Sequence, residues 1–161
     1  MKDKKILIID DEANTRHLLT LLFEKQGHRI IVSDSAVDMI QRIEKNEPDL
    51  IILDLSMPDI DGIAALKKSR QCKRCLKIPI IILTGKHDIE KKLTALKLGA
   101  LDYLTKPFQK NELLYRVQNL LNLMDQWRYN EDSCLEKKKE IRNNQVASNR
   151  PDSENKQDHE S

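Results

Sequence analysis

Short apolar runs alternate with helix-like patterns along most of the chain. Five runs rich in β-branched residues are too short for buried helices and predict strands at residues 6–9, 29–32, 50–53, 80–83 and 100–104. Three of them, ILII, LIIL and IIIL, are continuous. Continuous runs of this kind are typical of strands that are buried on both faces, as in a parallel sheet.

Between the runs, apolar residues recur at helical spacing and would share one face of each predicted helix. These faces are Leu18, Leu19, Leu22 and Phe23; Val37, Ile40 and Ile43; Leu93, Leu96 and Leu98; and Leu113, Leu114, Val117, Leu120, Leu121 and Met124. Gly27 and Gly99 lie where the helices before them would need C-caps. Strand and helix alternate five times, which predicts an α/β fold with a doubly wound sheet.

The sequence changes character after about Trp127. It becomes rich in charge, Asn and Ser and holds few large apolar residues. Such a segment buries too little surface to offset the entropy of ordering. We therefore expect one folded domain over residues 1–126. Residues 127–161 would hold an extension of the last helix, as far as about Lys139, and then a disordered polar tail.

The overall charge is nearly balanced. The chain has 28 Lys and Arg against 26 Asp and Glu, a net charge of +2, and only 4% aromatic residues. This composition does not favour nucleic acid or an anionic membrane as a partner. No apolar run approaches the ~20 residues that cross a bilayer, and the first run leads straight into Asp10 and Asp11. A signal peptide would not tolerate these acids, so we expect a cytoplasmic protein with no membrane partner.

Cys72 and Cys75 form a CxxC pair, while Cys134 lies far away in polar sequence. A structural zinc site needs four ligands, and no second Cys or His pair is spaced to complete one. We expect reduced thiols, at the surface or half-buried, and the sequence assigns the pair no role.

Polar residues follow four of the predicted strands. Asp10 and Asp11 come after the first run, Asp54 ends the third, Thr84 closes the fourth and Lys106 follows the fifth. In an open parallel sheet these positions share one edge, and ligands bind beyond it. Clustered carboxylates repel one another and call for a hard, oxygen-liganded cation such as Mg²⁺. The hydroxyl and the ammonium would then suit an anion on that cation, most naturally a phosphoryl group.

Four segments, ILIIDDE, LIILDLSMPDIDG, IIILTGK and DYLTKPF, resemble in order and spacing the signatures of response-regulator receiver domains of two-component systems. The resemblance covers about residues 4–124. It implies a five-stranded parallel sheet of flavodoxin-like order 2-1-3-4-5 with helices on both faces. It also implies a phosphoacceptor signalling domain and not an enzyme, with self-phosphorylation and self-dephosphorylation chemistry of its own.

The resemblance assigns roles at the acidic edge. Asp54 would accept a phosphoryl group from a histidine kinase or a histidine phosphotransfer protein, and so become a 4-aspartylphosphate. Lys106 would pair with a phosphoryl oxygen, and its peptide bond to Pro107 would be cis. The residues that would hold Mg²⁺ are Asp10, Asp11, Asp54 and, through its backbone carbonyl, Ser56.

The same resemblance predicts a switch and a docking surface. Thr84 would move toward the phosphoryl group, and Tyr103 would turn inward behind it, although an ordinary half-buried ring is the main alternative for Tyr103. Lys86 would flank the open side of the phosphoryl group. Histidine-bearing partners would dock on Glu12, Thr15, Leu18, Pro107 and Phe108. Ordinary core packing is an equal alternative for the two apolar members, Leu18 and Phe108.

The sequence also bears on the output of the receiver. The 161 residues leave no room for a DNA-binding or catalytic output domain. We therefore expect a stand-alone receiver that acts through protein–protein contact with an unknown downstream protein, and a phosphorylation-dependent dimer is a further expectation.

Two other functions use some of the same residues. A haloacid-dehalogenase-like phosphatase also uses a strand-end Asp, a Thr, a Lys and Mg²⁺. It carries a second Asp two residues after the nucleophile, where this chain has Ser56, and its acid pair comes last in the chain instead of first. A pseudo-receiver that acts only as an unphosphorylated interaction module is disfavoured because all the acids, Thr84 and Lys106 are present.

Overall fold

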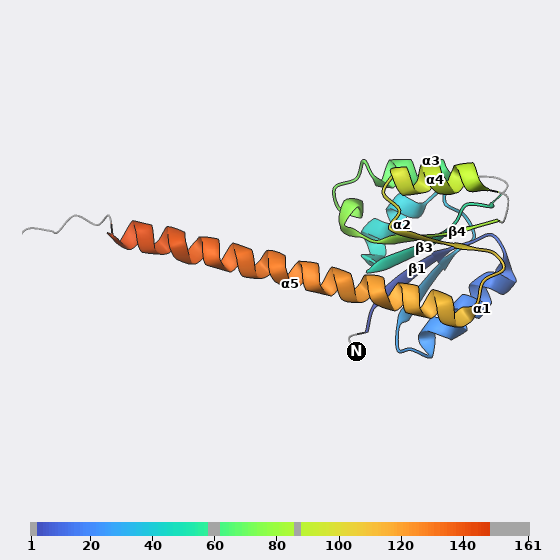
Figure 1. Ribbon diagram of the computed structural model, residues 1–161, viewed down its shortest axis with the longest axis horizontal. Coiled ribbons are helices and arrows are strands. Elements are labelled where there is room, and N and C mark those ends of the chain that lie inside the picture. The colour runs from blue at the N-terminus through green and yellow to red at the C-terminus, as the bar shows by residue number, and fades with distance from the viewer. Residues whose placement is uncertain (1–2, 58–61, 86–87, 149–161) are drawn as a thin grey trace, which may run out of the picture. The chain divides into compact units, whose positions relative to one another are not determined.

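The computed structural model describes residues 3–57, 62–85 and 88–148, with side chains up to residue 143 (Figure 1). The strands are β1 (Lys5–Ile9), β2 (Arg29–Ser33), β3 (Leu50–Asp54), β4 (Ile80–Thr84) and β5 (Asp102–Thr105). The helices are α1 (Ala13–Glu24), α2 (Met39–Asn46), α3 (Gly62–Ser69), α4 (Ile89–Lys97) and α5 (Lys110–Ser148), with a short 3₁₀ turn, η1 (Cys75–Lys77). All neighbouring strands pair in parallel in the order β2-β1-β3-β4-β5, which confirms the predicted doubly wound sheet.

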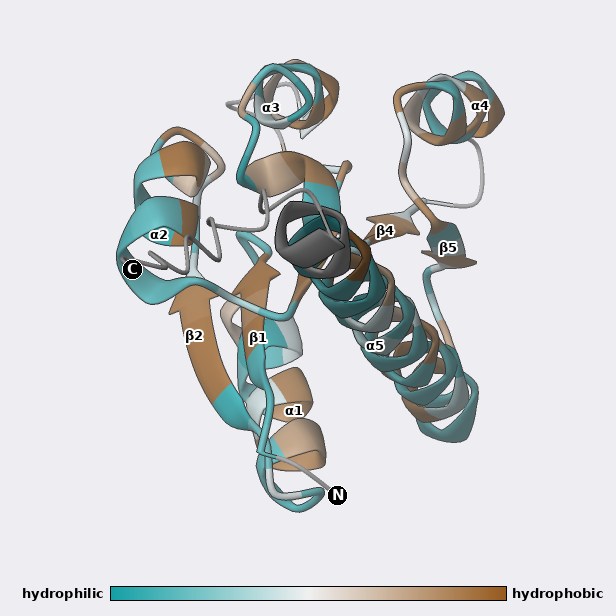
Figure 2. Cartoon of the chain, turned by 90° about the vertical axis from the view of Figure 1, so that its left-hand side faces the viewer, coloured by the Kyte–Doolittle hydropathy of each residue, from teal (hydrophilic) through white to brown (hydrophobic). Residues whose placement is uncertain are grey.

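Helices cover both faces of the sheet. Figure 2 shows α2, α3 and α4 on one side, with α1 and the first part of α5 on the other. Successive side chains of a strand point to opposite faces. In β1, Ile6 and Ile8 therefore pack toward α1 and α5, while Leu7 and Ile9 pack toward α2, α3 and α4. The apolar residues of the three central strands are all buried, as the continuous apolar runs predicted, and only Lys5 at the start of β1 is half-buried.

Two predicted helix faces differ from the structure. Val37 is 76% exposed because the backbone N–H of Val37 bonds the Ser35 hydroxyl in a turn that precedes α2. Leu93 is 52% exposed, and α4 instead buries the small side chain of Ala95. The Gly27 and Gly99 predictions are confirmed, since both have the positive φ (82° and 95°) that favours glycine after a helix.

Helix α5 is longer than expected. It runs to Ser148, past the predicted end near Lys139. No Gly or Pro occurs between Lys110 and Ser148, so no residue of that stretch terminates the helix. The chain forms two compact units, Met1–Met124 and Asp125–Ser161, and α5 contributes to both. The division at residues 126 and 127 stays a prediction, and the rest of the tail lies outside the described residues. None of the described helices is long and apolar enough to span a membrane.

His28 gives a test of the core packing under α1. It is 6% exposed, and its ring centroid lies 6.4 Å from that of Phe23. Burial lowers the pKa of His28 below its ordinary value of 6.5. Below about pH 6.5 the unfolded chain therefore binds a proton that the folded chain resists, and stability falls as the pH falls.

We predict that a His28→Gln variant loses less of its free energy of unfolding than the wild type between pH 8 and pH 5. Urea denaturation at both pH values measures the difference. An equal loss in the two proteins would show that His28 titrates alike in the folded and unfolded states.

Candidate functional site

The carboxyl ends of the strands bring the predicted site residues together. Asp54 is the last residue of β3, and Thr84 is the last residue of the neighbouring β4. Asp10 follows β1, on the other side of β3, and its backbone N–H donates to the Ser33 carbonyl at 3.1 Å. Lys106 follows β5, and its N–H donates to the Thr84 carbonyl at 2.8 Å. The peptide bond from Lys106 to Pro107 is cis, as predicted.

Three carboxylates form an acidic cluster at this edge. Asp10, Asp11 and Asp54 each offer an oxygen, and these oxygens lie within 4.8 Å of one another. Asp10 and Asp54 are 0% and 2% exposed, while Asp11 is exposed. Burial raises the pKa of Asp10, and the nearby charge of Asp54 adds to the effect, whereas hydrogen bonds to Lys106 and Glu12 oppose it. A set of oxygen ligands that carries excess negative charge fits a hard divalent cation such as Mg²⁺.

Lys106 is the cation that balances the two buried acids. Its Nζ donates to Asp10 Oδ2 at 2.8 Å and to Asp54 Oδ2 at 2.9 Å. Burial by itself lowers the pKa of Lys106, but the hydrogen bonds to the two carboxylates outweigh burial, and the pKa is raised. Lys106 is therefore charged at neutral pH and ties together the ends of β1, β3 and β5.

Backbone donors fix the other oxygen of each buried acid. The N–H of Ser56 donates to Asp54 Oδ1 at 2.8 Å, and the N–H of Glu12 donates to Asp10 Oδ1 at 2.9 Å. Both carboxylates thus direct Oδ1 to the backbone and Oδ2 to Lys106. The Ser56 hydroxyl accepts from the N–H of Gly85 at 3.1 Å, so it joins the loops after β3 and β4.

The two predicted switch residues lie on neighbouring strands. The Thr84 side chain is buried, and its Oγ1 is 3.4 Å from the Gly85 carbonyl oxygen, a long hydrogen bond. Tyr103 is half-buried and packs against the core cluster that α2, α3 and α4 share. Lys92 of α4 holds its Nζ 3.3 Å from the centroid of the Tyr103 ring, a close cation–π contact.

The predicted docking residues lie on α1 and its N-cap and in the loop after β5. Glu12 and Pro107 are exposed, Leu18 is half-buried, and the Thr15 hydroxyl donates to Glu12 Oε2 at 2.8 Å. Phe108 packs against the core beneath α1 and α5, which agrees with its packing alternative. Docking stays a prediction, and Lys86 lies outside the described residues.

Two residues at this edge were not predicted from the sequence. Arg16 donates from Nη1 to the Asp10 carbonyl at 2.7 Å and so braces the loop between β1 and α1. The second is Lys92, whose ammonium group lies over the Tyr103 ring. Both are long cations on helix surfaces, and no spacing signal distinguishes such residues from ordinary solvated charges.

Comparison with known proteins agrees with the fold and the site. A family model described as the response regulator receiver domain matches residues 6–118. The chain is 40% identical over 119 residues to the alkaline phosphatase synthesis transcriptional regulatory protein PhoP of Bacillus subtilis, covering 74% of this chain and 49% of that protein. It is 36% identical over 121 residues to the phosphate regulon transcriptional regulatory protein PhoB of Pseudomonas aeruginosa, covering 75% and 53%.

Solved structures agree as well. A response regulator receiver domain protein from Clostridium thermocellum matches with a TM-score of 0.70 at 28% identity, over 77% of this chain and 98% of that chain. The parallel sheet with acids at its carboxyl edge is that of the receiver class of signalling proteins, which the family model matches. The chain belongs to the response-regulator receiver domain family of two-component systems, which confirms the resemblance and sets aside the phosphatase alternative.

The expectation about partners and output is wrong. That expectation rests on the lack of an output domain in these residues, which does not carry over to the whole protein. The chain spans only about half the length of PhoP and PhoB, which are named as transcriptional regulatory proteins. The partner set drawn from that reasoning, including the phosphorylation-dependent dimer, is therefore not retained.

The shared ammonium group gives a stability prediction. Replacing Lys106 with Met, which is similar in length but uncharged, should leave two buried acids without their cation. We expect the free energy of unfolding, measured with denaturant in EDTA, to fall by about 3 kcal/mol, the lower end of the cost of a broken buried ion pair, because Lys106 is only half-buried. Millimolar Mg²⁺ should recover part of the loss, because a divalent cation neutralises the same acids. An unchanged free energy of unfolding in EDTA would contradict the role given to Lys106.

Proposed function

We propose that Asp54 accepts a phosphoryl group from a phosphohistidine of a histidine kinase or phosphotransfer protein, in a reaction that depends on Mg²⁺. One observation carries the proposal: Lys106 donates to both Asp10 and Asp54 within an acidic cluster that also includes Asp11. This arrangement would place a nucleophile, a cation and metal ligands around one point at the edge of the sheet. Family membership supports it, since the acids, Thr84 and Lys106 are all present.

The chemistry suits a carboxylate nucleophile. Phosphoryl transfer passes through a loose transition state, which needs alignment and charge neutralisation more than a strong nucleophile. Mg²⁺ held by Asp10, Asp11, Asp54 and the Ser56 carbonyl would supply positive charge to the phosphoryl oxygens. One Asp54 oxygen attacks phosphorus, and the bond to the histidine nitrogen breaks. The backbone N–H of Ser56 keeps the Asp54 carboxylate oriented through this step.

Lys106 would change partners during the reaction. Before transfer its ammonium group bonds Oδ2 of both Asp10 and Asp54. Once Asp54 carries the phosphoryl group as an acyl phosphate, its carboxylate charge is lost, and the phosphoryl oxygens offer a stronger partner for the ammonium. Through its backbone N–H, Lys106 also holds the end of β4, where Thr84 lies. Thr84 and Lys106 would thus both respond to the phosphoryl group.

Tyr103 would report the change at the α4 surface. In the present state Lys92 covers its ring, so any inward turn of Tyr103 must break this cation–π contact and free α4 at that point.

If Thr84 transmits the change, the NMR signals of the Tyr103 ring should shift on phosphorylation in the wild type and stay in place in a Thr84→Ala variant.

The acceptor assignment has a direct test. Incubation with acetyl phosphate and Mg²⁺ should add one phosphoryl group to the wild type, and borohydride reduction should mark the modified side chain for peptide mapping. Asp54→Asn, which keeps shape but removes the nucleophilic charge, should take up none. Asp132→Asn, a change of an exposed acid on α5, is the matched control and should behave as the wild type. A phosphoryl group mapped to any other residue would overturn the proposal.

A further inference from the structure

The turn between α3 and β4 holds a pair of cysteines that the receiver chemistry does not use. Cys72 lies between α3 and η1 and is half-buried, while Cys75 begins η1 and is 1% exposed. The N–H groups of Cys75 and Leu76 donate to the Cys72 carbonyl at 3.0 and 3.2 Å. These bonds close the turn that carries both cysteines.

The two thiols interact directly with each other. Cys72 packs against the core cluster to which Cys75 belongs, so the two side chains lie close together. The hydrogen bond from Cys75 is the main cause of the lowered pKa of Cys72. Burial raises the pKa of Cys75 to about 12. Cys72 is therefore the sulfur that loses its proton first, and Cys75 stays protonated beside it.

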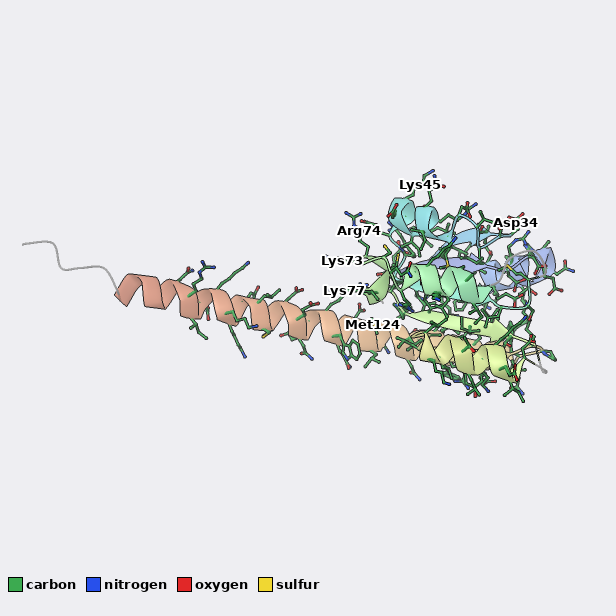
Figure 3. All side chains as sticks on the ribbon, turned by 90° about the horizontal axis from the view of Figure 1, so that it is seen from above. Asp34, Lys45, Lys73, Arg74, Lys77 and Met124 are labelled. Carbon is green, nitrogen blue, oxygen red and sulfur yellow. The ribbon has the colours of Figure 1, made fainter. Side chains whose placement is uncertain are left out.

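The surroundings of the pair are mainly cationic. Figure 3 shows Lys73, Arg74 and Lys77 extending from this turn. Arg70 donates from Nη1 to the Cys75 carbonyl at 3.4 Å. Glu44 is the opposing charge and acts against ionisation of both sulfurs. Arg74 also forms an ion pair with Glu47, at 4.0 Å, so the four cations of this turn outnumber the two nearby acids and attract anionic or polar oxidants.

We propose that Cys72 and Cys75 form a reversible thiol–disulfide site that is oxidised by peroxides. The Cys72 thiolate attacks one peroxide oxygen, the O–O bond breaks, and hydroxide leaves and takes up a proton to become water. The resulting Cys72 sulfenic acid is then attacked by the sulfur of Cys75, and a second water leaves as the S–S bond forms. Two thiols are oxidised by two electrons, and one peroxide is reduced to two waters.

The site is separate from the acidic cluster. It precedes β4, whereas Thr84 ends that strand at the opposite edge of the sheet. Cys75 belongs to the core cluster shared by α2, α3 and α4, so the disulfide would change packing there and leave the three acids untouched. We therefore expect oxidised protein to accept a phosphoryl group at Asp54 within about twofold of the reduced rate. The thiol site can thus be tested whether or not Asp54 is the acceptor.

The test uses the full chain, fully reduced and then treated with one equivalent of hydrogen peroxide. In a Cys134→Ser background, mass spectrometry should show the loss of two hydrogens, a disulfide within the peptide that contains both cysteines, and recovery with a dithiol. Cys75→Ser should stop at a Cys72 sulfenic acid, which dimedone traps. Cys72→Ser should leave the buried Cys75 thiol unmodified. Circular dichroism checks that each variant is folded.

The wild-type chain carries its own control. Cys134 is exposed on α5, in the other compact unit, and should react with peroxide at least several-fold more slowly than Cys72. The proposal fails if folded protein keeps Cys72 and Cys75 as thiols while Cys134 is oxidised. It also fails if the only disulfide formed joins two chains. Because these outcomes are read in the wild type, they decide the matter even if Cys75→Ser does not fold.

Discussion

One half-buried ammonium group shared by two buried carboxylates sets the conditions for the rest of this receiver domain. Asp10 and Asp54 each direct one oxygen to Lys106, at 2.8 and 2.9 Å. Burying an unpaired charge costs several kcal/mol. The two acids are therefore stable at this edge only when the ends of β1, β3 and β5 lie close enough for Lys106 to reach both of them. The parallel sheet order β2-β1-β3-β4-β5 achieves this, because it sets the ends of β1 and β4 on either side of β3.

This charge balance also links the acidic site to the outer strands. Lys106 bonds two acids through its side chain and the Thr84 carbonyl through its backbone, so it connects Asp54 to the ends of β4 and β5. Tyr103 also lies on β5, and Lys92 of α4 lies over its ring. The cysteine pair lies before β4, at the opposite edge of the sheet, where cations outnumber acids. The sheet thus carries two chemically distinct sites at opposite edges.

The sequence was enough to predict the strands, the five residues of the acidic edge and the glycines after α1 and α4. These features depend on local rules: apolar runs, strand-end positions and positive φ. Val37 and Leu93 were misplaced because helical spacing does not show which turn a neighbouring hydroxyl will form, or which helix packs through a small residue. The contact between Lys92 and Tyr103 depends on tertiary packing alone. The prediction of a stand-alone receiver was wrong for another reason. It relied on the absence of an output domain from these residues, and an absence of this kind says nothing about the whole protein.

The competition between Lys106 and Mg²⁺ is the most direct test of this account. If both cations balance the same carboxylates, removing the ammonium should strengthen metal binding. Calorimetric titration of Mg²⁺ into the wild type and Lys106→Met at pH 7.5 measures this. The account predicts about tenfold tighter binding in the variant, equivalent to ~1.4 kcal/mol. Equal or weaker binding in a folded Lys106→Met variant would mean that the lysine and the metal do not share Asp10 and Asp54, and would contradict it.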